Sequence, residues 1–165
     1  MTPEKFIEKY LPAAQYIEQQ WQIPALVTLS QAAAESGWGT KAPGYNFFGY
    51  TAPNGYSGKR QLLKTVEKHT SPNVSYPVII KITKLSNGWY NYLVRRYFKS
   101  YSNAIQGFED YARLLSFSDR YQGAFDYTDD PERFLAVVVN SGYNPNPTQY
   151  YQFVLSVMQS IKKRL

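Results

Sequence analysis

Apolar positions recur with a helical period at the start of the chain. Five apolar residues share one face of a predicted first helix: Phe6, Tyr10, Ala14, Ile17 and Trp21. Thr2 and Pro3 form a typical N-terminus for this helix. A second segment, from Pro24 to about Glu35, is apolar on nearly all sides, which is typical of a buried helix. Since Gly37 follows, we expect the helix to end near Glu35, with little water around this carboxylate.

The helical period is lost in the middle of the chain. Residues 37–75 are rich in Gly, Pro, Asn and Tyr, so we expect loops and short irregular strands there. Two runs of β-branched and aromatic residues then flank Asn87 and Gly88. This pattern predicts a β-hairpin over about residues 74–98, with a tight turn at Asn87-Gly88.

Helices are predicted again in the last third of the chain. Ser102 can cap one helix, Asp130 can cap another, and a last helix spans about residues 148–161. Four residues of this last helix are expected to face inward: Phe153, Val154, Val157 and Ile161. The order of helices, β region and helices indicates a single α+β domain over residues 1–165, with a β lobe of about residues 50–98.

Composition and charge narrow the range of partners. The chain has 16 Tyr, nine Phe and three Trp, which suits a groove for a polar polymer such as a glycan, although a Tyr-rich core would explain them equally well. The net charge of +6 is scattered apart from a cluster at residues 162–164. It favours an anionic partner without selecting among nucleic acid, acidic wall polymer and anionic lipid. No apolar run reaches the roughly 18 residues of a transmembrane segment, and the N-terminus lacks the apolar stretch of a signal peptide, although an export signal could have been removed.

Most kinds of catalytic chemistry are poorly supported. With one His and no Cys, a metal site or a cysteine nucleophile is not expected, nor is any cofactor. Carboxylate acid–base chemistry remains, and after the carboxylates assigned to caps and helix surfaces are set aside, Glu35 and Glu67 are left. Burial and the helix dipole both disfavour ionisation of Glu35, so it can stay protonated near neutral pH and act as a general acid. The alternative is a structural carboxylate that accepts backbone hydrogen bonds or pairs with an Arg.

Four blocks of sequence resemble a known family. They read ALVTLSQAAAESGWGTK, YNFFGYTA, FKSYSNAIQGFEDYARLL and NSGYNP, and their order is that of the peptidoglycan-hydrolysing glucosaminidases. This is glycoside hydrolase family 73, which includes flagellar muramidase-like proteins and bacterial autolysins. The resemblance covers about residues 24–161. It implies a lysozyme-like α+β fold, mainly helical, with a small β-hairpin lobe beside the active-site groove.

The resemblance assigns roles to individual residues. Glu35 falls on the family's catalytic general acid. Glu67, which follows Thr65 in a Thr-x-Glu pattern, matches the second carboxylate, and Tyr143 matches a tyrosine whose hydroxyl approaches the scissile sugar. The residues expected to bind substrate are Trp38, Asn46, Phe48, Tyr50 and Asn140. Packing at the helix end is an alternative role for Trp38.

The chain departs from the family pattern in two places. An insertion of about residues 68–86 follows Glu67, and an alternative alignment would place Leu85 at the second catalytic position. Glu67 is favoured because its spacing from Gly58 agrees with the family and because a loop insertion costs less than a lost charge. Residues 144–147 replace the family's Ala-Thr-Asp-Pro.

The resemblance implies hydrolysis of the β-1,4 bond between N-acetylglucosamine and N-acetylmuramic acid. Inversion through a water molecule would need carboxyl groups about 6.5 to 9.5 Å apart, whereas attack by the substrate's own acetamido oxygen would retain configuration. The alternatives are a muramidase or lytic transglycosylase that uses Glu35 alone, and a non-catalytic glycan-binding or assembly module. The expected partners are peptidoglycan glycan strands and not nucleic acid, and the protein is expected to be a monomer. We expect the protein to be extracellular, periplasmic or associated with the cell wall, or to be released by a phage.

Overall fold

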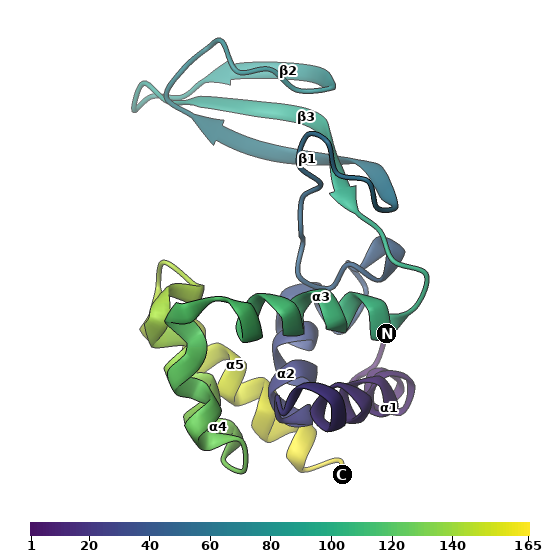
Figure 1. Ribbon diagram of the computed structural model, residues 1–165. Coiled ribbons are helices and arrows are strands. Elements are labelled where there is room, and N and C mark those ends of the chain that lie inside the picture. The colour runs from purple at the N-terminus through teal and green to yellow at the C-terminus, as the bar shows by residue number, and fades with distance from the viewer. The chain divides into compact units, whose positions relative to one another are not determined.

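The computed structural model describes all 165 residues and divides into two compact units (Figure 1). Residues 1–48 and 101–165 form a helical unit, and residues 49–100 form a β unit. The predicted α+β class is therefore confirmed, whereas the interpretation as a single domain stays a prediction.

Five α-helices and three short helical segments build the helical unit. They are α1 (Pro3–Trp21), α2 (Ala25–Ser36), η1 (Pro43–Tyr45), α3 (Ala104–Phe117), η2 (Asp119–Tyr127), α4 (Pro131–Val138), η3 (Val139–Tyr143) and α5 (Pro147–Lys162). Helix α2 packs against α1, α4 and α5, and Figure 1 shows it between α1 and α5. Its small residues Ala32 and Ala33 are buried, which allows the neighbouring helices to approach closely. The central helix predicted from its apolar sequence is therefore confirmed.

The helix caps agree with the sequence prediction except at one position. The Thr2 hydroxyl accepts a hydrogen bond from the Lys5 N–H at 3.3 Å, and Asp130 caps α4. Ser102 was expected to cap α3, but Asn103 does so: its side-chain oxygen accepts from the Gln106 N–H at 3.0 Å. The prediction was wrong by one residue because Ser and Asn are both good N-caps and stand side by side.

One core residue of α5 was also wrongly predicted. Val154, Val157 and Ile161 are buried, but the Phe153 side chain is 53% exposed. The buried stripe continues through Met158, which is four residues after Val154 and three before Ile161. Phe153 lies beside this stripe, so its ring is left on the surface.

The β unit contains a three-stranded antiparallel sheet in the order β1-β3-β2. Its strands are β1 (Arg60–His69), β2 (Val78–Lys84) and β3 (Tyr90–Lys99). The predicted hairpin is confirmed as β2 and β3, and Gly88 takes a φ of 85° in the turn between them, a conformation that favours glycine. The predicted insertion of about residues 68–86 supplies the end of β1 and the edge strand β2.

Strand β1 was not predicted as a regular element. Its side chains alternate between exposed and half-buried, as expected for a strand. The exposed face, however, carries the apolar Leu62 and Val66 between charged residues, and the half-buried face carries Gln61 and Glu67. Because both faces mix polar and apolar residues, the sequence shows no period of two.

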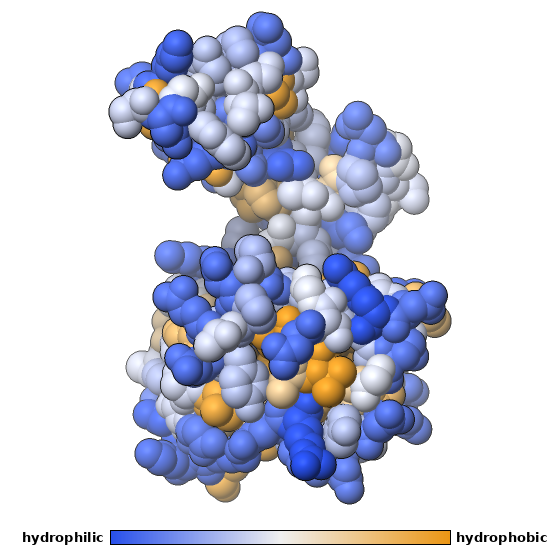
Figure 2. All heavy atoms as spheres, turned by 90° about the vertical axis from the view of Figure 1, so that its left-hand side faces the viewer, coloured by the Kyte–Doolittle hydropathy of each residue, from blue (hydrophilic) through white to orange (hydrophobic).

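On the face drawn in Figure 2, hydrophilic residues predominate, and the larger group of hydrophobic residues lies on the helical unit. None of the helices combines the length and apolar character needed to cross a lipid bilayer.

Candidate active site

Glu35 lies in the last turn of α2, where the chain leaves the helix abruptly. Gly37 adopts the left-handed conformation (φ 57°, ψ 55°), and the N–H of Trp38 reaches back to the Ala33 carbonyl at 2.8 Å. This arrangement is a common glycine-dependent helix stop. The helix is buried, but the Glu35 side chain is exposed. The expectation of little water around this carboxylate is therefore met only in part: the helix ends at the protein surface, but the protein around the carboxyl group still removes some of its water.

Two tyrosine hydroxyls donate hydrogen bonds to one oxygen of Glu35. The Tyr143 hydroxyl lies 3.1 Å from Oε1 of Glu35 and the Tyr150 hydroxyl 2.7 Å from the same atom. Tyr143 ends η3 and Tyr150 lies in the first turns of α5, and their rings are 5.7 Å apart. Gly142, directly before Tyr143 within η3, has a φ of 94° and departs from helical geometry. The structure thus joins the predicted Tyr143 to Glu35 and adds Tyr150, which was not predicted.

The pKa of Glu35 is raised above its ordinary value of 4.5. The main cause is desolvation, since the protein packed around the exposed carboxyl group removes part of its water and disfavours the charged form. The hydrogen bonds from Tyr150 and Tyr143 act in the opposite direction because they stabilise the carboxylate. The net effect favours the protonated acid that general acid catalysis needs.

A buried relay of hydrogen bonds fixes Tyr150. The side-chain N–H of Gln31 donates to the Tyr150 oxygen at 2.9 Å, and the hydroxyl of Tyr111 donates to the Gln31 oxygen. Gln31 and Tyr111 are fully buried. This relay connects α3, α2 and α5, and it leaves the Tyr150 hydroxyl hydrogen directed to Glu35. The available sequence signal was an amide in a nearly apolar helix, one turn before Glu35.

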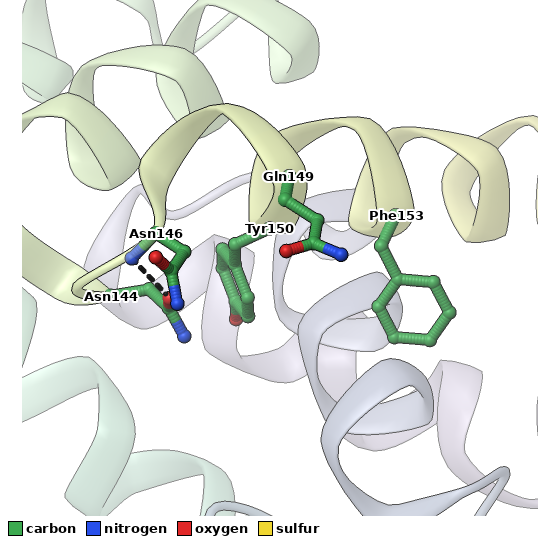
Figure 3. A pocket seen from close by; sticks show the side chains of 5 residues that line it. All are labelled: Asn144, Asn146, Gln149, Tyr150 and Phe153. Carbon is green, nitrogen blue, oxygen red and sulfur yellow. Dashed lines mark hydrogen bonds between the residues drawn. The ribbon is translucent and has the colours of Figure 1, made fainter.

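A pocket of about 350 Å³ opens beside Tyr150 (Figure 3). Its lining residues are Asn144, Asn146, Gln149, Tyr150 and Phe153. Figure 3 shows the Gln149 and Phe153 side chains on the same side of α5 as Tyr150. Asn144 uses its amide oxygen to accept from the Asn146 N–H at 2.9 Å, which shapes the turn into α5. The lining contains an exposed aromatic ring and several amides but no charged group.

The predicted substrate-binding residues of the helical unit have different surroundings. Asn46 is buried, and Phe48 is buried with its ring stacked on Tyr111 at 4.4 Å. The Trp38 ring packs edge-on against the Phe6 ring, with 5.7 Å between the ring centres. This contact agrees with the alternative role of Trp38, which is packing at the end of α2. Asn140 is exposed within η3. Of all the predicted site residues, the structure brings only Tyr143 into contact with Glu35, and substrate contacts by the others stay predictions.

Glu67 and Tyr50 belong to the β unit. Glu67 lies on β1 with its side chain 29% exposed, and Oε1 pairs with the Arg96 guanidinium at 3.1 Å. The Arg96 guanidinium also lies 5.6 Å from the centre of the Tyr76 ring. The pKa of Tyr76 is raised by burial and by the charge of Glu67. Glu67 is therefore an ion-paired, partly accessible carboxylate, which leaves its catalytic role a prediction.

Known proteins similar to this chain include several cell-wall hydrolases. The peptidoglycan hydrolase FlgJ of Vibrio parahaemolyticus is 29% identical over 167 residues, which cover 98% of this chain and 48% of that protein. The solved structure of a C-terminally truncated glycoside hydrolase domain from Salmonella typhimurium FlgJ is 26% identical with a TM-score of 0.76, and the match covers 98% of this chain and 99% of that one. A mutant of a peptidoglycan hydrolase from Sphingomonas sp. A1 is 27% identical with a TM-score of 0.71, covering 98% and 97%.

These similarities locate the chain within a family. The chain spans about half the length of the FlgJ proteins it matches. The helices and small sheet match the solved glycoside hydrolase domain over nearly their whole length, which supports the predicted lysozyme-like fold. A family model described as mannosyl-glycoprotein endo-beta-N-acetylglucosaminidase matches residues 11–163. The resemblance inferred from the sequence is therefore confirmed, and the chain belongs to the glucosaminidase family.

Proposed function

We propose that this chain is a peptidoglycan hydrolase that cleaves the β-1,4 bond between N-acetylglucosamine and N-acetylmuramic acid, with Glu35 as the general acid. The observation that carries the proposal is an exposed carboxyl group with a raised pKa that receives two tyrosine hydrogen bonds. The names of the relatives, peptidoglycan hydrolase and autolysin, support the choice of substrate.

The hydrogen bonds indicate which oxygen of Glu35 delivers the proton. Tyr143 and Tyr150 both donate to Oε1, so the proton of the neutral acid belongs on Oε2. From Oε2 it passes to the glycosidic oxygen as the bond to the leaving sugar breaks. The negative charge that then develops on Glu35 is stabilised by the two hydroxyls already in place. The arrangement therefore assists proton donation without any rearrangement of the two tyrosines.

The pocket beside Tyr150 suits an uncharged sugar ring next to the cleaved bond. The exposed Phe153 ring offers a flat apolar face, and the side-chain amides of Asn146 and Gln149 have no partner within the protein. A volume of about 350 Å³ lies within the usual range for small-ligand sites. The absence of charge in the lining favours N-acetylglucosamine over the carboxylate-bearing N-acetylmuramic acid.

Glu67 is proposed as the second carboxylate on the strength of the family pattern. Whether it activates water or stabilises an acetamido-derived intermediate is decided by the anomeric form of the first product. Trp38, Asn46, Phe48, Tyr50 and Asn140 are retained as proposed substrate contacts. The protein is proposed to act as a monomer at the cell wall, outside the cytoplasm or after release by a phage, with no nucleic acid partner.

The test is the loss of turbidity of purified sacculi with Glu35→Gln, which should be at least about 100-fold slower than the wild type. Glu132→Gln, a change of the same type at a surface ion pair, should keep full activity. A Glu35→Gln protein as fast as the wild type would refute the mechanism. Mass spectrometry of the products distinguishes the alternatives, because a transglycosylase leaves an anhydro sugar and a muramidase leaves a different reducing end. Unchanged activity of Glu67→Gln would reject only the second carboxylate.

A further inference from the structure

Positive charge in this chain is concentrated in the β unit. Residues 49–100 contain nine of the 18 Lys and Arg residues but only one of the 12 acidic residues, Glu67, and so carry a net charge of +8. The helical unit contains nine basic and eleven acidic residues, a net charge of −2. The charge that looks scattered along the sequence is therefore segregated in the structure.

Five exposed basic residues lie on one face of the sheet, here named the cationic sheet face, and a sixth, Lys99, lies opposite Arg60 on the same face but is half-buried. The five exposed residues are Arg60, Lys64, Lys68, Lys81 and Arg95. The first three alternate along β1, Lys64 is directly opposite Arg95 on β3, and Lys81 on β2 is opposite Leu93, two residues before Arg95. All five side chains are exposed and none forms a salt bridge. Glu67, the one acid of the unit, points to the other face with Arg96.

The two faces of the sheet differ in what covers them. On the face of Glu67, Tyr92 is fully buried, and its hydroxyl donates to the Ser71 carbonyl at 2.7 Å and accepts from the Val74 N–H at 3.2 Å. The segment Ser71–Val74 therefore covers that face. The cationic sheet face has no comparable cover, since alternate residues of β1 from Arg60 to Lys68 are all exposed.

The pairing of Lys64 with Arg95 is unfavourable for the fold alone. Like charges directly opposite each other in an antiparallel pair destabilise a sheet, whereas an acidic residue at either position would stabilise it. No acidic residue on this face compensates the repulsion between Lys64 and Arg95. An external polyanion would supply the missing negative charge, and its binding would relieve the repulsion.

We propose that the cationic sheet face binds the carboxylates of the stem peptides of peptidoglycan and so holds the enzyme on its polymeric substrate. The choice of this polyanion rests on the proposed function. Single-stranded nucleic acid fits the face less well, because single strands need open aromatic surfaces for stacking, and duplex DNA is compared directly in the experiment below. Among the residues of the three strands on this face, the one aromatic ring is that of Tyr97, and the Arg60 guanidinium covers it at 3.8 Å.

The experiment measures binding without cleavage. The Glu35→Gln protein is sedimented with purified sacculi stripped of phosphate-containing polymers, at low and at high salt. Binding should weaken with salt, and Lys64→Gln/Arg95→Gln should weaken it about tenfold or more at low salt. The matched control is Lys5→Gln/Lys9→Gln, which removes the same charge from exposed positions of α1. Melting temperatures show whether each variant is folded. The melting temperature of Lys64→Gln/Arg95→Gln should be unchanged or raised, because the repulsion between the two side chains is lost.

Chemical blocking of the carboxylates identifies the ligand. Sacculi whose carboxylates are converted to neutral amides should lose the salt-dependent part of the binding. The proposal is overturned if Lys64→Gln/Arg95→Gln binds as well as its parent, if blocked sacculi bind equally well, or if duplex DNA binds more tightly than sacculi at the same salt. Salt-sensitive binding through these residues, combined with a wild type that does not cleave sacculi, would refute the proposed function and leave this site standing.

Discussion

The chemistry of Glu35 depends on two opposing effects on one carboxyl group. Desolvation raises its pKa, and the hydroxyls of Tyr143 and Tyr150 lower it. A raised pKa keeps the proton on a larger fraction of the molecules at a given pH, whereas the two hydrogen bonds make the proton easier to give away. The tyrosines are therefore expected to set both the rate of proton donation and its pH range.

Tyr150→Phe removes one hydrogen bond from the ionised form of Glu35. The pKa of Glu35 should rise further, so the fall of kcat/KM at high pH should move to higher pH. The maximum rate should drop about tenfold, because a hydrogen bond to the developing carboxylate is lost. Tyr151→Phe is the matched control, since Tyr151 makes no contact with Glu35. A pH profile of Tyr150→Phe that overlays the wild type would disprove this role.

The same raised pKa predicts a dependence of stability on pH. The folded state binds the Glu35 proton more tightly than the unfolded state, so this contribution is present below about pH 4.5 and is lost as the pH rises through the folded-state pKa. Glu35→Gln has no such loss. The melting temperature of the variant minus that of the wild type should therefore increase between about pH 4 and 8. The gain should be no more than about 2–4 °C, because solvent screens an exposed group. Melting temperatures that stay parallel over this range would contradict the raised pKa.

Phe153 tests the sugar pocket. Phe153→Ala should weaken binding of tri-N-acetylchitotriose to the Glu35→Gln protein about 3- to 10-fold, which is the range expected for loss of an aromatic contact. Phe117→Ala is the control, because Phe117 is also an exposed phenylalanine of the helical unit, with a side chain 74% exposed. Titration calorimetry measures both, and equal affinities for the two variants would remove Phe153 from the site.

Sequence motifs singled out Glu35 and Tyr143, whose roles in catalysis stay predictions. Glu35 and Tyr143 were found and meet in the structure. Tyr150 and Gln31 were missed because Tyr150 is one of 16 tyrosines and Gln31 is one polar residue within an apolar helix. Their roles arise from hydrogen bonds between helices that are far apart in sequence, such as the bond between Gln31 and Tyr150. No local period in the sequence encodes that contact.

At the scale of elements, the relay through Gln31 ties α2 to α3 and α5. Gln31→Leu would leave the buried hydroxyl of Tyr111 without its acceptor, which should cost about 1–3 kcal/mol of unfolding free energy and lower activity through a misplaced Tyr150. Thr28→Val on the same helix is the control. The Thr28 hydroxyl is buried without a partner, so its removal should leave stability unchanged or raise it by up to about 1 kcal/mol. Denaturant unfolding measures the free energy of unfolding of both variants and of the wild type.

A double variant separates the relay from simple packing. If the hydrogen bond between Tyr111 and Gln31 is the cause, Gln31→Leu/Tyr111→Phe should lose less stability than the two single changes added together, because the orphaned hydroxyl is gone. Additive losses would show that the relay contributes only by filling space.

The strands show why element prediction succeeded in one place and failed in another. The β2–β3 hairpin was predicted because β-branched runs flank Asn87 and Gly88, and the turn residues carry the signal. No such turn signal adjoins strand β1, and the exposed face of this strand carries the basic residues that we propose bind an anion. These basic residues remove the hydrophobic alternation by which a strand is recognised.

At the scale of the whole molecule, the β unit is an insertion into the helical unit. Its two ends are paired, since the Lys99 N–H donates to the Tyr50 carbonyl at 2.9 Å and Thr51 bridges Phe98. Of the twelve largest fully buried side chains, eleven belong to the helical unit and only Tyr92 to the β unit. The helical unit therefore has nearly all of the large core and should fold by itself.

Replacement of residues 49–100 by about four Gly and Ser residues tests this organisation, since paired strands hold the two ends a few ångströms apart. The shortened protein should melt cooperatively, because its core is complete, and Glu35 should keep its bonds to Tyr143 and Tyr150. It should not cleave sacculi, because Glu67 and the cationic sheet face are both removed. Calorimetry measures the first result and loss of sacculus turbidity the second. The lack of a cooperative transition would show that the helical core depends on the β unit, and cleavage at the wild-type rate would show that Glu35 acts without a second carboxylate.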